Sequence, residues 1–125
     1  MKLQRYFQRL ENTIHSRGDI EIEQISMELL SAFIGHIWGR LRFYDGSLLE
    51  FEERVRLIDG IEKTLYRYHY QRADGALVFR YDNAPHYPGL PNFPHHKHIG
   101  EQVEPARPPD LSEVLREIDE LLYEE

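Results

Sequence analysis

The fold is decided by the stretch YRYHYQRADGALVFRYD, residues 66–82. Its aromatic and apolar side chains occupy even positions before Asp74-Gly75 and odd positions after it: Tyr66, Tyr68, Tyr70, Leu77, Phe79 and Tyr81. Such alternation is typical of half-buried strands, because successive side chains point to opposite faces. A two-residue turn at Asp74-Gly75 matches the two apolar faces. The stretch therefore predicts an antiparallel hairpin with Tyr70 opposite Phe79.

The reverse face of this hairpin is polar. The same register sets His69 opposite Arg80 and Arg67 opposite Asp82. These four side chains can bind phosphate or exchange protons, and the register places them on one face. The strand that carries Arg80 and Asp82 then runs directly into a loop rich in proline and histidine.

Further strands are indicated upstream. Residues 32–44 and 49–57 both carry apolar side chains at odd positions: Phe33, Ile37, Leu41, Phe43, Leu49, Phe51, Val55 and Leu57. A three-residue loop, Tyr44-Asp45-Gly46 with Gly46 left-handed, pairs Leu41 with Leu49 and keeps these faces matched. Residues 20–30 give a mixed pattern, which we interpret as a strand.

Helical periodicity marks both ends of the chain. Residues 2–16 place Leu3, Phe7, Leu10 and Ile14 on one side, and a capping pattern at Asp110 opens a final helix over 110–123. We therefore predict one α+β domain over residues 1–125, an antiparallel meander of four to five strands within residues 20–83 with an N-terminal and a C-terminal helix on one sheet face. Residues 83–109 are predicted to be a Pro/His-rich loop.

Charge is unevenly distributed along the chain. The formal net charge is −7, yet residues 63–98 hold five Lys and Arg against two acids, together with five of the seven histidines. An acidic body disfavours non-specific nucleic-acid binding, whereas a basic middle permits local binding of an anion. The polar N-terminus has no signal-peptide pattern, and no apolar run is long enough to cross a membrane. We expect a cytoplasmic protein.

The loop supplies the candidate catalytic groups. Long loops without regular structure are uncommon unless they are functional. Metal-free ribonuclease chemistry needs a base, an acid and a cation, roles that suit histidine and arginine. The predicted catalytic residues are Arg80, His86, His95, His96 and His98. The predicted substrate-binding residues are Arg67, His69, Asp82, Tyr87, Phe93 and Lys97, with Tyr87 and Phe93 able to stack on unpaired bases.

Two alternatives stay open. In a metal site, His96 and His98 could share a side of an extended segment with His86 or Asp82 as third ligand. Because no His-Glu-x-x-His or paired-cysteine pattern supports such a site, we expect no metal and no cofactor. In the other alternative the chain is a non-catalytic protein-binding module whose loop is its interaction surface.

Several motifs together resemble the TumE family of toxins. They are DGS at 45–47, YRYHYQ at 66–71, FRYDNAPH at 79–86, FPHHKH at 93–98 and PPDLSEVL at 108–115. The likeness runs from about Ala32 to the final helix. It implies a toxin of a type II toxin–antitoxin pair, neutralised by a cognate DNA-binding antitoxin, and by analogy an action on RNA or the translation machinery. The resemblance names no catalytic residue and leaves the oligomeric state open, a homodimer included.

Overall fold

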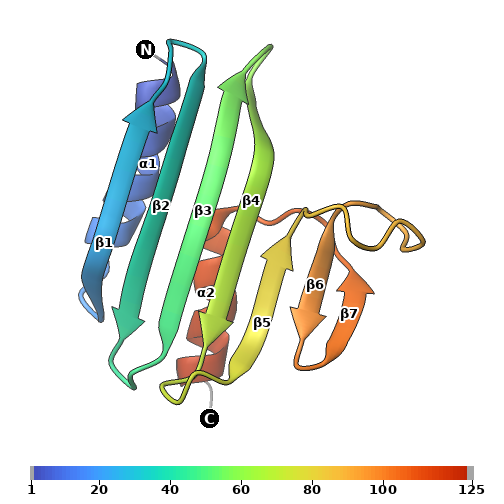
Figure 1. Cartoon of the computed structure of the whole chain (residues 1–125). Helices are drawn as coiled ribbons and strands as arrows, with labels where there is room; N and C mark the ends of the chain where they lie inside the picture. The colour runs from blue at the N-terminus through green and yellow to red at the C-terminus, as the bar shows by residue number, and fades with distance from the viewer. Residues whose placement is uncertain (1, 124–125) are drawn as a thin grey trace.

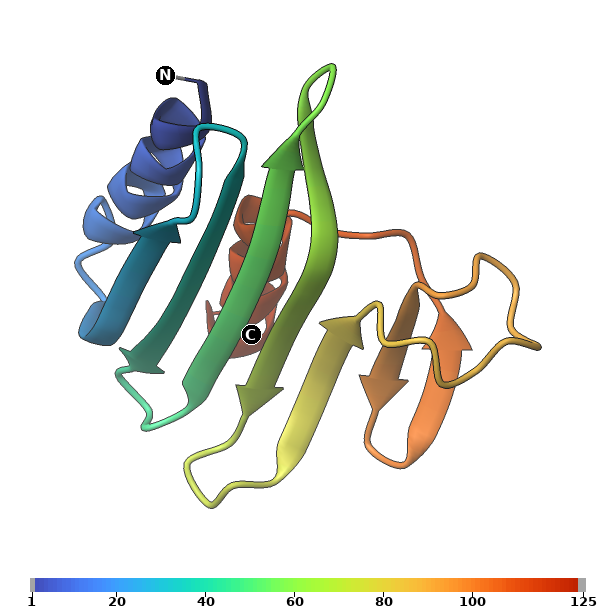
Figure 2. The same cartoon turned by 45° about the horizontal axis from the view of Figure 1, so that its top comes forward.

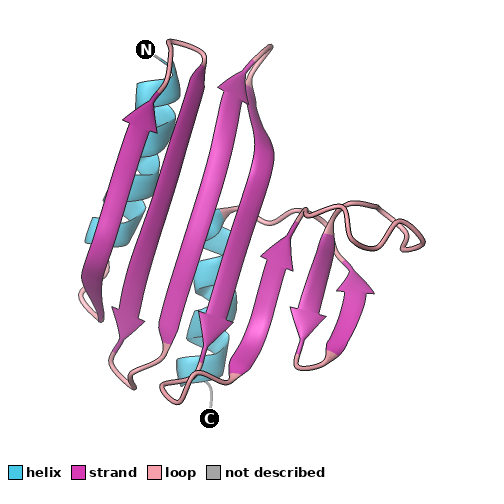
Figure 3. Ribbon diagram, in the orientation of Figure 1, coloured by secondary structure: helices cyan, strands magenta, loops and turns pink. Residues whose placement is uncertain are grey.

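The computed structural model describes residues 2–123. Its elements are α1 (Lys2–His15), β1 (Ile20–Leu29), β2 (Ile34–Phe43), β3 (Leu48–Leu57), β4 (Ile61–Gln71), β5 (Leu77–Asp82), β6 (His96–Ile99), β7 (Gln102–Pro105) and α2 (Leu111–Tyr123). The seven strands form one antiparallel sheet in which each strand pairs with its neighbours in sequence (Figures 1 and 3). The chain is therefore a simple meander with a helix at each end.

Both helices pack on the same sheet face (Figure 2). The core on that face holds the apolar stripes of α1 and α2 and the inward side chains of the strands: Leu3, Phe7, Leu10, Ile14, Ile37, Leu41, Phe43, Leu49, Phe51, Val55, Tyr66, Tyr68, Tyr70, Phe79, Leu111, Val114, Leu115 and Ile118. The opposite face, here called the open face, is covered by neither helix (Figure 1). Within residues 2–123, neither helix is long and apolar enough to cross a membrane.

The predicted α+β class with terminal helices is confirmed, but the predicted count of four to five strands is too low. Residues 83–109, predicted to be a loop, contain β6 and β7. β6 pairs with β5 through Arg80–His98, Tyr81–Lys97 and Asp82–His96. Gly100 then adopts a positive φ of 58° and turns the chain into β7. These strands were missed because each has only four residues, too few for a visible alternation.

The β2–β3 hairpin has the predicted geometry. Leu41 pairs with Leu49, and Gly46 has a φ of 86° in a three-residue loop closed by a hydrogen bond from Phe43 N–H to Ser47 O. Glycine is required at this position because other residues are strained at such a φ.

The prediction of a two-residue turn between β4 and β5 is wrong. Arg72 N–H donates to Ala76 O, so the loop has three residues, and Gln71 pairs with Leu77. Tyr70 nevertheless pairs with Phe79 as predicted, which makes Val78 the extra residue of a β-bulge. The bulge restores the match of apolar faces that the longer turn would have broken.

The chain segments at the helix ends are fixed by polar contacts. At the start of α2, Glu113 N–H donates to Asp110 Oδ1 at 2.8 Å, the predicted cap. At the other end of the sheet, Asp19 accepts hydrogen bonds from Tyr123 and Arg17, and Arg17 also binds Asp119. Burial would raise the pKa of Asp19, but the hydrogen bonds from Tyr123 and Arg17 lower it below its ordinary value.

One carboxylate lies in the core. Glu53 of β3 is fully buried, and Tyr68 donates a hydrogen bond of 2.5 Å to its Oε2 while Tyr6 donates to its Oε1. Lys63 donates to the Tyr68 hydroxyl at 2.9 Å and to Pro109 O. Burial and then the negative charge of Glu53 raise the pKa of Tyr68 well above its ordinary value, so the phenol keeps the proton that it donates. The buried charge is thus hydrogen-bonded, as a stable core requires.

Candidate functional site

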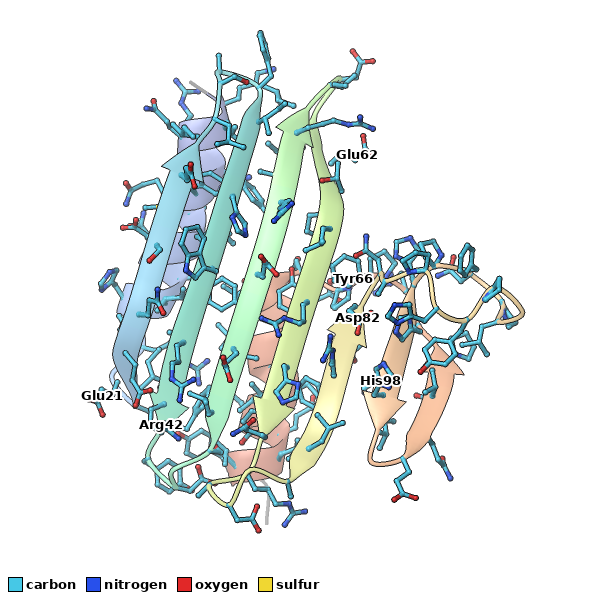
Figure 4. The ribbon with its side chains drawn as sticks, in the orientation of Figure 1. Glu21, Arg42, Glu62, Tyr66, Asp82 and His98 are labelled. Atoms are coloured by element: carbon cyan, nitrogen blue, oxygen red, sulfur yellow. The ribbon has the colours of Figure 1, made fainter. Side chains whose placement is uncertain are left out.

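The candidate site lies on the open face where β4, β5 and β6 run side by side. Figure 4 labels two of its members, Asp82 and His98, whose side chains project from β5 and β6. The β4–β5 register sets Arg67 opposite Asp82 and His69 opposite Arg80, as predicted. The β5–β6 register adds His96 beside Asp82 and His98 beside Arg80. Strand alternation therefore gathers cations and imidazoles around one carboxylate.

Asp82 is the centre of this group. Its side chain is about 5% exposed. Oδ1 accepts a hydrogen bond of 3.0 Å from Ala84 N–H, which turns the chain at the end of β5. Oδ2 accepts one of 2.9 Å from Arg80 Nε and lies 3.7 Å from His98 Nε2. The carboxylate is thus held in one orientation from two sides.

His96 is the most buried imidazole of the site, with a side chain only 2% exposed. Its Nδ1 lies 2.9 Å from Pro94 O, and because a carbonyl oxygen can only accept, Nδ1 carries a proton. Its Nε2 lies 2.9 Å from Asp82 Oδ1, the distance of an ion pair when the ring is protonated, but it makes no hydrogen bond within residues 2–123. The fold therefore fixes the direction of this ring and leaves its second nitrogen without a hydrogen bond.

Two more unsatisfied donors or acceptors lie on β4. Arg67 Nε and His69 Nδ1 are both buried and without a hydrogen-bond partner within residues 2–123. Burial lowers the pKa of His69, and it also lowers the pKa of the partly exposed His98. Both rings are therefore shifted toward the neutral form, which can accept as well as donate a proton.

A pocket adjoins the cluster. It has a volume of about 530 Å³ and is lined by Glu52, Thr64, Leu65, Tyr66, Arg67, Arg80, Asp82, Asn83, Ala84 and Pro85. This volume lies within the range of small-ligand sites. Farther along the loop, the ring of Tyr87 packs edge-on against His96 and His98, with centroids 5.1 and 5.9 Å away. The loop thus returns over β6 and closes one side of the cluster.

Several predicted site residues lie elsewhere. Lys97 points to the helix-covered face and donates to Glu117 at 2.8 Å. His95 stacks on Tyr66 and bonds its hydroxyl through Nδ1 at 3.0 Å. His86 and Phe93 lie on the exposed loop. The structure therefore brings together Arg67, His69, Arg80, Asp82, Tyr87, His96 and His98, and it leaves Lys97, His95, His86 and Phe93 outside this group.

Two polar residues at the pocket, Glu52 and Asn83, were not predicted from the sequence. Glu52 stands at an even position of β3, so strand parity alone could have placed it on the open face next to Arg67. Asn83 accepts from Tyr66 N–H and donates to Thr64 O, which ties the start of the loop to β4. Nothing in the sequence pattern indicated that interaction.

The comparison with protein families gives a match over nearly the whole chain. The family described as Toxin TumE matches residues 6–122. Searches of curated proteins and of solved structures found no match. Membership of a toxin family implies an antitoxin as partner. Since the match covers residues 6–122, the resemblance noted from the motifs is confirmed, and the chain belongs to the TumE toxin family.

Proposed function

We propose that this protein is the toxin of a toxin–antitoxin pair and that it acts on RNA in the cytoplasm, with the open face around Asp82 as the RNA-binding surface. The proposal is based on Arg67 Nε, which is buried and has no hydrogen-bond partner within residues 2–123. Arg67 lies beside Arg80 at the wall of a pocket of about 530 Å³. A buried guanidinium nitrogen without an acceptor is costly, and a phosphate oxygen is an acceptor that satisfies it.

The carboxylates of Glu52 and Asp82 stand opposite Arg67 on the two neighbouring strands, but other groups around Arg67 suit an anion with an attached ring. Arg80 and His69 add positive or donor groups on the same face, while Leu65, Ala84 and Pro85 give the pocket apolar walls. Tyr87, about 36% exposed, offers an aromatic face at the edge of the cluster. Single-stranded RNA presents this combination of phosphate and stackable base.

The net charge of −7 does not oppose this proposal. Part of the acidic charge of the open face is already paired: Glu23 with Arg40 and Arg42, and Glu50 with Arg40. Arg67 makes no ion pair with any residue of the range 2–123. A local basic site within an acidic surface binds RNA with a modest dependence on salt, because few phosphates are neutralised.

We further propose that RNA bound here is cleaved. His98, with a side chain 23% exposed, is accessible to a ribose hydroxyl, whereas the ring of His96 is buried and packs against Tyr87. In metal-free cleavage, one of His98 and His69 would take the proton of the ribose 2′-hydroxyl, whose oxygen attacks the phosphorus. The other would give a proton to the 5′-oxygen as its bond to phosphorus breaks, and Arg67 and Arg80 would hold the charged phosphate.

Binding is tested by fluorescence anisotropy with a labelled single-stranded RNA over a series of salt concentrations. Arg67→Gln should weaken binding about 10-fold and reduce the slope of log K against log salt by ~0.7, the value for one phosphate that is no longer neutralised. Arg5→Gln is the matched control, because Arg5 is exposed on α1 on the other side of the sheet. If the wild type binds no RNA, or if both variants bind alike, the proposal fails.

Cleavage is tested separately by incubating the protein with total RNA, with and without a chelator. Cleavage that resists the chelator supports proton transfer by histidines alone. Cleavage that disappears with the chelator indicates a metal ion at the site. RNA binding without cleavage supports a non-catalytic RNA binder and overturns the nuclease, and the absence of both supports the protein-binding module.

A further inference from the structure

We propose that Asp82, His96 and His98 form a binding site for one divalent transition-metal ion of the zinc class. This inference does not depend on RNA being the target of the toxin. It competes with metal-free proton transfer by His98, because the same Nε2 cannot bind a metal ion and transfer a proton. It rests on three ligands of two types that such ions prefer, on their placement by two paired strands, and on a buried nitrogen without a hydrogen bond that points into the group.

The three ligands come from adjacent strands. His96 and His98 alternate on β6 and therefore project to the same face, and the β5–β6 register puts Asp82 beside them. One ligand atom from each residue lies within 4.8 Å of the other two. In a tetrahedral site with bonds of ~2.1 Å the ligand atoms are ~3.4 Å apart, so a shift of at most ~1.4 Å closes the group. His98, with a side chain 23% exposed, is the least buried of the three.

The orientation of His96 is the strongest observation. Because Nδ1 donates to Pro94 O, Nε2 is the ring nitrogen left to bind a cation. It lies 2.9 Å from Asp82 Oδ1 at a position only 2% exposed. A proton on Nε2 makes this contact an ion pair, and a metal ion bound to both atoms would take the place of that proton. In a tetrahedral site with bonds of ~2.1 Å the two atoms would be ~3.4 Å apart, which requires them to separate by ~0.5 Å.

The surrounding hydrogen bonds are those of a metal centre. A histidine ligand commonly donates its other N–H to a backbone carbonyl, as His96 does to Pro94. The carboxylate ligand is commonly held by further donors, as Asp82 is by Ala84 N–H and Arg80 Nε. Each oxygen of Asp82 accepts one of these hydrogen bonds, and Oδ1 is the oxygen that lies 2.9 Å from His96 Nε2. The positive charge of Arg80 lowers the affinity for a metal ion, but its guanidinium group does not occupy the site.

The three protein ligands leave one or more positions on the metal open. Tyr87 covers one side of the two imidazole rings, and the pocket that contains Arg67 and Arg80 lies on another. A phosphate oxygen that reaches the metal from this pocket would also meet the two guanidinium groups. The site is thus suited to a metal that binds an anionic substrate directly.

The test is metal binding by the full chain without a histidine tag and without RNA. The protein is treated with EDTA, dialysed, and titrated with ZnCl2 by isothermal titration calorimetry and with Co²⁺ while its visible absorption is recorded. We expect one ion per chain and Co²⁺ bands in the visible region. A wild type that binds neither ion would show that Asp82 and His96 form a plain buried ion pair, and this result would overturn the proposal.

Two variants locate the site. His98→Gln should weaken Zn²⁺ binding at least ~10-fold, since it removes a ligand. It should also abolish the rise in thermal midpoint that Zn²⁺ gives the wild type. His86→Gln is the matched control, because His86 is a loop histidine outside the cluster. Equal losses in both variants, or none in His98→Gln, would refute the assignment. The effect of Arg67→Gln on RNA binding is measured in EDTA, so the two proposals can fail independently.

Discussion

The substitution Tyr68→Phe removes a single oxygen atom from the core and tests how the buried carboxylate of Glu53 is stabilised. The ring stays the same size, so no cavity is created. Two hydrogen bonds are removed: the one of 2.5 Å that Tyr68 donates to Glu53 and the one of 2.9 Å that it accepts from Lys63. Glu53 keeps Tyr6 as a donor, and Lys63 keeps Pro109 O as an acceptor.

The expected decrease in the free energy of unfolding follows from these hydrogen bonds. Hydrogen bonds to charged groups contribute ~1.5–3 kcal/mol each, and both of the removed bonds involve a charged partner at a residue with no exposed surface. Because each charged partner keeps one other hydrogen bond, we expect a decrease of about 3 kcal/mol rather than the sum of the upper values. Domains of this size are stable by ~5–15 kcal/mol, so the variant still folds.

The measurement is urea denaturation followed by circular dichroism. With a slope of ~2 kcal/mol per M, the midpoint of Tyr68→Phe should fall by ~1.5 M. Tyr66→Phe is the matched control, because it removes only the neutral hydrogen bond of 3.0 Å to His95 and should fall by ~0.5 M. If Tyr68→Phe is no less stable than Tyr66→Phe, the phenol does not stabilise the buried charge, and the reasoning is refuted.

The remaining predictions concern packing, pH and the site. Gly39→Ala should lower the free energy of unfolding, measured by thermal denaturation, by ~1–3 kcal/mol, because its Cβ would lie 2.4 Å from the ring of Phe51. Adding Phe51→Leu to this variant should recover part of the lost stability. Asp19→Asn should lower the free energy of unfolding by ~0.5–1 kcal/mol at pH 7. Since folding lowers the pKa of Asp19, its stabilisation is present above the unfolded pKa of ~3.9 and is lost as pH falls through the lower folded value. The melting curves of the wild type and the variant should therefore converge in acid, and a difference that stays constant with pH would contradict this prediction. Lys97→Ala should bind RNA as the wild type does, because Lys97 lies on the helix-covered face, and a loss as large as that of Arg67→Gln would contradict the placement of the site.

The register of the sheet was predictable because one of its faces is buried. Shifting a strand by one residue would move Tyr68 and Tyr70 to the open face, so the apolar residues determine which residues pair. This constraint is strong enough that Tyr70 pairs with Phe79 although the turn was predicted wrongly. The turn itself was not predictable, because a three-residue loop with a bulge at Val78 and a two-residue loop give the same pairing.

The candidate site was predictable only in part. Alternation put His96 and His98 on a common side, and the same rule could have removed Lys97, which stands between them. The pairing of β6 with β5 was not visible, because four residues rich in histidine carry no apolar pattern. Only that pairing places His96 beside Asp82.

The pairing within the β2–β3 and β4–β5 hairpins, the two amphipathic helices and the polar face with Arg67, His69, Arg80 and Asp82 were predictable from the sequence, because period-2 and helical patterns are local and each apolar face must be buried. The contacts of those polar residues with β6 and the loop depend on the tertiary structure. The return of the loop over β6, the burial of His96 and the hydrogen bond of its ring to Pro94 depend on segments brought together by folding. No local pattern encodes such interactions, and they turn a row of histidines into a site centred on Asp82.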